Sequence, residues 1–237
     1  MERVEALAPA LEAAYASPFF GIALTALCYV AGKRINARYP SVLTSPFLVT
    51  VVLVIAFLFF SGVPLSSYQV GGDILSMMLV PATAILGTTI YSRRVFLREN
   101  FLPLVVGGLV GAATSIASVW TLSRAFGVDE AFMRSMMPKS VTTPIAMELS
   151  ALSGGIVPIS IIAVAFTGIF GVVLGPLVTK VTGVTDPIAV GAAYGTASHV
   201  IGTSKAVEIG ETEAAASSVS ICMAGLMTVG VYLVFLI

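Results

Sequence analysis

The sequence is poor in charged residues and nearly devoid of histidine, cysteine and tryptophan. Only 10% of its 237 residues are charged, and it contains one His, two Cys and one Trp. So few such side chains cannot supply a metal-ligand set or a nucleophile with its base and orienting acid, so we expect neither an enzyme nor a cofactor or metal site. The formal net charge of zero also argues against nucleic acid as a partner, because phosphate binding needs clustered Lys and Arg.

Apolar residues, in contrast, are abundant. They make up 57% of the chain, and the mean hydropathy is +1.02. A soluble domain of this length would have to expose large apolar patches to carry such a composition. The composition therefore predicts an integral membrane protein whose first partner is the lipid bilayer. Residues 1–16 mix charges with Ala and Leu, which predicts a short helix at the membrane interface rather than a cleavable signal peptide.

About eight segments are apolar enough for membrane helices, each of which needs about 20 residues. We therefore predict an all-α, polytopic fold that forms one domain over residues 1–237. Breaks occur at Pro81, at 138–144 and at 195–202; we expect interrupted or re-entrant helices there that point toward a common cavity, because irregular backbone does not face lipid. The segments cover residues 18–32, 43–61, 72–92, 101–126, 132–153, 157–181, 187–209 and 215–237.

Basic residues are concentrated in two short loops, which follow the first and third segments. The positive-inside rule places both loops in the cytoplasm and the N-terminus outside. Beyond the fourth segment the basic residues do not assign the loops to one side of the membrane. The sequence also leaves open whether residues 132–153 cross the membrane or turn back. The loop residues are Lys33, Arg34 and Arg38, then Arg93, Arg94 and Arg98.

Proline spacing indicates an internal repeat. The prolines that flank the second and sixth segments are equally spaced, and a Gly-Thr motif in the third segment recurs in the seventh. This pattern is typical of duplicated transporters with matching interrupted helices, here with possible units 18–126 and 132–237. Parallel and inverted repeats both remain open. The positions are Pro46 and Pro64, Pro158 and Pro176, and residues 87–89 and 202–204.

The segment PKSVTTPI, from Pro138 to Ile145, is the best pointer to function. Its prolines favour locally extended backbone, and a half-helix that begins inside the bilayer presents unpaired N–H groups to an anion. A lysine and three hydroxyl groups complete a candidate anion site. The alternative is that the lysine snorkels to the interface and the hydroxyl groups bond their own helix. The candidate residues are Lys139, Ser140, Thr142 and Thr143.

A second polar concentration, GTASHVIGTSKAVE, occupies residues 195–208. Small residues surround His199, the chain's one histidine, and the glycines of this stretch permit an unwound turn. The candidate substrate-binding residues here are Ser198, His199, Gly202 and Thr203. Lys205 and Glu208 are three residues apart and suit a structural ion pair on one helical face, with a role in transport as the alternative.

Two residues are candidates for proton coupling. An unperturbed histidine titrates near pH ~6.5, so His199 changes charge in the range in which a proton gradient is useful. Glu148 follows the break by about one turn, and it would have to be buried, or paired with a cation such as Lys139, to serve in this way. For His199, the alternative is an ordinary hydrogen-bonded packing residue.

The motifs PKSVTTPIA, GIFGVVLGP (168–176) and GTASHVIGTSKAVE together resemble the LrgB/CidB family, over about residues 68–236. The resemblance implies a multi-spanning protein of the plasma (inner) membrane. Some family members are named as antiholin-like modulators of murein hydrolase activity. Others, including the LrgB-like half of the chloroplast glycolate and glycerate translocator, are described as carriers of small carboxylates. The implied partner is a smaller, holin-like LrgA/CidA membrane protein, and copies of the chain are expected to associate.

From these observations we expect a secondary carrier of small monocarboxylates such as glycolate, glycerate or pyruvate, with proton coupling through His199 or Glu148. The two broken segments would meet near the middle of the bilayer. The alternative is an antiholin-like regulator of murein hydrolase export and autolysis, which needs oligomerising helices but leaves the polar breaks unexplained.

Overall fold

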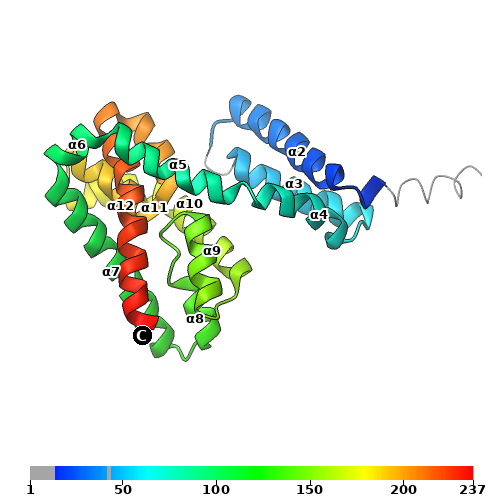
Figure 1. Ribbon diagram of the computed structural model, residues 1–237. Coiled ribbons are helices and arrows are strands. Elements are labelled where there is room, and N and C mark those ends of the chain that lie inside the picture. Colours follow the sequence, from blue (N-terminus) through cyan, green and yellow to red (C-terminus); the bar gives the residue numbers. More distant parts are fainter. Residues whose placement is uncertain (1–13, 42–43, 237) are drawn as a thin grey trace, which may run out of the picture. The chain divides into compact units, whose positions relative to one another are not determined.

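The computed structural model describes residues 14–41 and 44–236, and no strand occurs within them (Figure 1). The chain divides into two compact units, one ending at Pro81 and the other beginning at Ala82. The predicted all-α class is therefore confirmed. Of the predicted interfacial helix over residues 1–16, all but the last three residues lie outside the described part of the chain.

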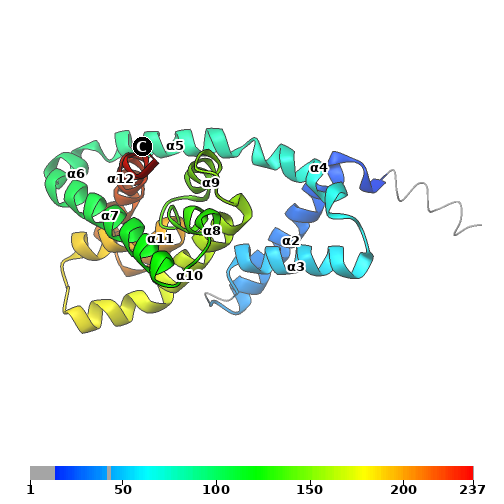
Figure 2. The same ribbon diagram turned by 90° about the horizontal axis from the view of Figure 1, so that it is seen from below.

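Among its described residues, the first unit contains helices α2, α3 and α4, of which α2 and α3 lie side by side (Figures 1 and 2). Both begin with proline after a serine whose hydroxyl oxygen accepts a backbone N–H, the usual combination at a helix start. Gly21 of α2 packs against the backbone of Gly71 in α4, and a side chain at either position would not fit. The helices are α2 (Pro18–Arg38), α3 (Pro46–Ser61) and α4 (Leu65–Ser76).

Pro81 is not the point at which the third apolar segment breaks. The interruption lies at Met77 and Met78, between α4 and α5 (Leu79–Ser92). Pro81 stands in the first turn of α5, where its missing N–H would have had no helical partner. The predicted break is therefore present but lies a few residues earlier.

The second unit carries the remaining helices. α7 and α12 lie side by side and enclose a core of Leu104, Val219 and Met223 (Figure 1). α11 packs on both α10 and α12, and α10 also contacts α8 and α9. The bounds are α6 (Arg94–Glu99), α7 (Phe101–Ala125), α8 (Glu130–Met136), α9 (Thr143–Leu152), α10 (Val157–Thr182), α11 (Pro187–Ile209) and α12 (Glu211–Leu236).

Three helices of the described chain are long and apolar enough to cross a membrane: Phe101–Ala125, Val157–Thr182 and Glu211–Val234. This supports a membrane protein but does not confirm eight spans. The other predicted segments match helices in position, yet α8 and α9 are short, α11 is broken, and α2 ends in a charged stretch.

The proposed internal repeat is also not confirmed, because its matching prolines occupy different structures. Pro46 begins α3 and Pro64 precedes a separate helix, α4. Pro158 and Pro176, in contrast, both lie within the single continuous helix α10. Equal spacing in the sequence therefore does not correspond to equivalent places in the fold.

Candidate functional site

The segment PKSVTTPI forms the tip of a helical hairpin. α8 ends at Met136 and α9 begins at Thr143, and the residues between them lie outside both helices. Pro138 is fully buried, and Pro144 stands in the first turn of α9, where a missing N–H is tolerated. The predicted interruption at 138–144 is thus confirmed as a turn between two short helices.

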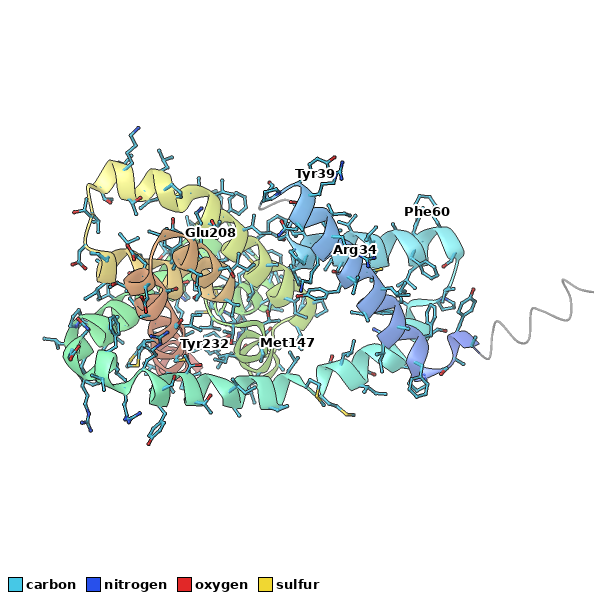
Figure 3. All side chains as sticks on the ribbon, turned by 90° about the horizontal axis from the view of Figure 1, so that it is seen from above. Arg34, Tyr39, Phe60, Met147, Glu208 and Tyr232 are labelled. Carbon is cyan, nitrogen blue, oxygen red and sulfur yellow. The ribbon has the colours of Figure 1, made fainter. Side chains whose placement is uncertain are left out.

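Hydrogen bonds close the open end of this hairpin. The Arg134 guanidinium donates to the Ser153 backbone oxygen at 2.6 Å, which joins the end of α8 to the end of α9. The hydroxyl of Tyr232, labelled on α12 in Figure 3, is 2.8 Å from Ser153 Oγ and 3.1 Å from the Arg134 backbone oxygen. Arg134 also donates to the exposed Glu130 carboxylate and lowers the pKa of that carboxyl group. We call this cluster of Arg134, Ser153 and Tyr232 the neck.

α11 is a second hairpin. His199 has φ 43° and ψ −134°, and the helix breaks at this residue. Gly202 packs against the Tyr194 backbone oxygen, and Ala206 lies in one cluster with Val190. In an unbroken helix, residues 190 and 206 would be about 24 Å apart. The second half of α11 therefore folds back along the first, which confirms the predicted break in residues 195–202.

The two hairpins approach α10 from opposite ends. The first is fixed near the start of α10, where the Ser160 hydroxyl donates to the Ser135 backbone oxygen at 2.8 Å.

The second hairpin runs from the other end of α10 along three of its glycines. The facing pairs are Gly175 and Tyr194, Gly171 and Ser198, and Gly168 and His199. A side chain at any of the three would overlap α11, so this stripe lets the helices approach closely. Figure 2 shows α8, α10 and α11 together.

The tips of the two hairpins meet on the first third of α10, at Val164. The Val164 side chain packs with Val141 and Ala146 of the first hairpin. Its backbone oxygen lies 2.9 Å from Nε2 of His199, the tip of the second. The structure therefore brings together the two polar segments that the sequence analysis singled out.

Lys139 faces a groove rather than a carboxylate. Its ammonium group donates to Ser115 Oγ of α7 at 3.1 Å, and Ser115 Oγ is 2.8 Å from Ser140 Oγ. These three residues and Ser198 line a groove of about 1440 Å³ between α7, α10 and the first half of α11. Lys139 and Asp186 are the charged residues among the described ones that line it, and most of its wall is apolar. The groove thus offers one positively charged polar corner.

Thr142 and Thr143 lie at the start of α9 rather than in the groove. Thr143 is the first helical residue and is partly buried. Thr142 is 6% exposed, and its Oγ1 has no hydrogen-bond partner among the described residues. The predicted anion site is therefore divided between the groove, with Lys139 and Ser140, and a buried helix terminus.

His199, Thr203 and Gly202 hold the second tip together. A backbone oxygen can only accept a hydrogen bond, so His199 Nε2 must carry the hydrogen that it shares with Val164. The Thr203 hydroxyl is 3.1 Å from the His199 backbone oxygen and 2.7 Å from Ser217 Oγ of α12. These contacts make the break in α11 a defined turn, in which His199 is buried.

Two other candidate residues lie apart from the tips. Glu148 is exposed on α9, and Lys139, its predicted cation partner, instead bonds Ser115. The role of Glu148 in proton coupling stays a prediction. Lys205 donates to Glu208 at 2.7 Å, which confirms the predicted structural ion pair.

Sequence reasoning missed several polar partners, above all Ser115, Ser217 and the residues of the neck. Ser115 follows Thr114 in the glycine-rich span α7, and two adjacent hydroxyl groups in such a helix were an available signal. Ser217 and Ser220 likewise lie on a face of α12 that is fully buried. Tyr232 carries no local signal, because its partners are 79 or more residues away in the sequence.

Comparison with known proteins covers nearly the whole chain. The model of the LrgB-like family matches residues 25–237. The antiholin-like protein LrgB of Bacillus subtilis is 35% identical over 92% of this chain and 95% of its own, and that of Bacillus mycoides is 34% identical over 93% and 96%. The uncharacterized protein YwbG of Bacillus subtilis is 35% identical over 89% of this chain and 95% of its own. No solved structure matches.

Proposed function

Because this chain belongs to the LrgB-like family, we propose that it is an antiholin-like protein of the plasma (inner) membrane. Similarity over more than nine-tenths of both chains to proteins named antiholin-like LrgB supports this proposal. In this role it regulates murein hydrolase export and autolysis together with an LrgA/CidA-type membrane partner. The positions of the basic loops support an N-terminus outside.

Gene deletion and complementation test this function. We expect deletion in the native host to change the rate of detergent-induced autolysis, and expression of the intact chain to restore it. The variant Gly195→Val serves as the matched control, because it disrupts the packing of α11 while leaving the membrane helices of the sequence in place. Equal autolysis in the deletion strain, the complemented strain and the parent would contradict the regulatory role.

The second candidate function is a carrier of small monocarboxylates, and one observation favours it. Two hairpins that enter from opposite ends of α10 bring their polar tips together at Val164, beside a groove with a lysine at its polar corner. A regulator that only oligomerises has no use for such a site. Carriers, in contrast, place substrate sites at half-helix ends near the bilayer middle, because these ends offer unpaired backbone groups.

The chemistry of a carrier follows from the two tips. Lys139 attracts the carboxylate into the groove, and the hydroxyl groups of Ser115 and Ser140 guide it. His199 donates from Nε2 to Val164, so Nδ1 is the nitrogen that accepts a further proton. A proton taken up there would balance the charge of the carboxylate. Movement of one group of helices against the other would then expose the site to each side in turn.

Proteoliposomes distinguish the two functions. A carrier gives saturable uptake of labelled glycolate, glycerate or pyruvate that related 2-hydroxy and 2-oxo acids inhibit. His199→Gln should retain exchange but lose accumulation driven by a proton gradient, and Lys139→Ala should abolish uptake, with Lys139→Arg rescuing it only in part. Linear, unselective leakage that neither variant changes would reject the carrier and leave the antiholin-like function.

A further inference from the structure

The start of α9 is a helix terminus without a cap. In most helices a side chain at the N-cap position accepts one of the free N–H groups of the first turn. Thr142 holds this position in α9, but its side chain makes no capping hydrogen bond. Helical bonding begins with the N–H of Ala146, which donates to the Thr142 backbone oxygen at 3.0 Å. Pro144 has no N–H, so those of Thr143 and Ile145 are the ones that the helix leaves available.

The burial of Thr142 makes the missing cap informative. Thr142 is 6% exposed, and its Oγ1 has no hydrogen-bond partner among the described residues. Its surroundings are apolar, with Val141, Ala146 and Val164 each at most 2% exposed. A buried hydroxyl without a partner is costly, so native proteins generally supply a partner for it.

The unpaired groups all suit one kind of partner. Two N–H groups and a hydroxyl hydrogen can each donate, and the positive end of the helix dipole adds to their attraction for negative charge. Lys139 lies three residues before Thr142 and places a cation at the groove. Thr142, Thr143 and Ile145 do not line the groove, so the terminus is a separate place from it.

We propose that the start of α9 is a small-anion site, in which Thr142 Oγ1 and the N–H groups of Thr143 and Ile145 hold a monocarboxylate. This deepens the proposed carrier function and rests on it for the identity of the anion. Lys139 then guides the carboxylate from the groove but does not hold it at the bound position. Chloride has the same chemistry in this setting, so the experiment includes both anions.

Binding to the purified full-length protein in detergent tests the site. Isothermal titration with glycolate and, separately, with chloride should show binding to the wild-type protein. Thr142→Val preserves the shape and removes the hydroxyl, and should weaken anion binding roughly tenfold, the effect of losing one hydrogen bond to a charged group. Thr142→Ser should restore it. Ser150→Ala is the matched control, because Ser150 is also a buried, unpartnered hydroxyl of α9 but lies two turns from the terminus.

Each outcome decides a separate question. Equal weakening by Thr142→Val and Ser150→Ala, or unchanged binding in Thr142→Val with complete loss in Lys139→Ala, would overturn the proposal and return the carboxylate to the groove. No binding of either anion would overturn it as well. Binding that depends on Thr142, in a protein without saturable uptake in proteoliposomes, would leave the site standing and reject the carrier. Binding of chloride but not glycolate would assign the site to an inorganic anion and overturn its carboxylate part.

Discussion

The two hairpins of the second unit reach the same place by different means. α8 and α9 are separated by six residues that include Pro138, and side-chain hydrogen bonds at the neck join Arg134 of α8 and Tyr232 of α12 to Ser153 after α9. α11 turns at one residue, His199, and its glycines pack directly against the backbone of neighbouring segments. The first hairpin should therefore be sensitive to the loss of polar groups, and the second to the addition of a single methyl group.

The largest effect is expected from Gly195→Ala. A Cβ at this position would overlap the backbone oxygen of Ser217 in α12, and backbone cannot move aside as a side chain can. We expect a loss of about 3 kcal/mol in the free energy of unfolding, at the upper end for overpacked cores. Thermal unfolding in detergent measures it. Gly230→Ala is the control. Gly230 lies on α12, and its added methyl meets nothing within 4 Å, so this variant should unfold no earlier than wild type.

The next effect in size concerns the turn of α11. His199→Ala removes the side-chain hydrogen bond to the Val164 oxygen and opens a space beside Gly168, so we expect a loss of about 2 kcal/mol. His199→Gln keeps a donor and should lose less. The same unfolding measurement checks both variants. Equal stability of His199→Ala and wild type would mean that the turn does not depend on this bond.

A smaller effect is expected at the neck of the first hairpin. Tyr232→Phe removes the hydroxyl that bonds Ser153 Oγ and the Arg134 backbone oxygen, and should cost about 1 kcal/mol. Tyr29→Phe, at a tyrosine that is 49% exposed on α2, should change nothing. If the neck holds the hairpin, amide hydrogen exchange in α8 and α9 should also rise in Tyr232→Phe while exchange in α11 stays constant.

The smallest effect belongs to the ion pair of Lys205 and Glu208. The two side chains are 31% and 67% exposed, so water screens their attraction. Lys205→Ala should therefore change the free energy of unfolding by less than about 0.5 kcal/mol. A larger loss would show that charge, as well as glycine packing, holds the second half of α11.

The positions of the two hairpin breaks could be predicted from the sequence, because their causes are local, whereas the break predicted at Pro81 lies at Met77 and Met78. Prolines limit the backbone on either side of Lys139, and glycines around His199 permit a sharp turn. The site residues in these breaks, such as Ser140 and Ser198, could be predicted for the same reason.

The tertiary contacts of the two breaks could not be predicted from the sequence. The partner of Lys139 is Ser115, 24 residues away, and nothing near either residue indicates the pairing. The backward fold of α11 depends on contacts such as that of Val190 with Ala206, which only the tertiary structure provides. The exposure of Glu148 could not be predicted either, because it depends on which face of α9 is covered, and a ten-residue helix with few polar residues does not reveal that face.

Because the two hairpins approach α10 from opposite ends, we propose that they enter from opposite faces of the membrane and turn back. Single cysteines test it most directly, in a background in which Cys28 and Cys222 are replaced by alanine. Val128→Cys and Leu152→Cys flank the first hairpin, and Val184→Cys and Glu211→Cys flank the second. A membrane-impermeant maleimide, applied to right-side-out and inverted vesicles, should label the first two from one face and the last two from the other. Labelling of Val128→Cys and Leu152→Cys from different faces, or of all four variants from the same face, would contradict the account.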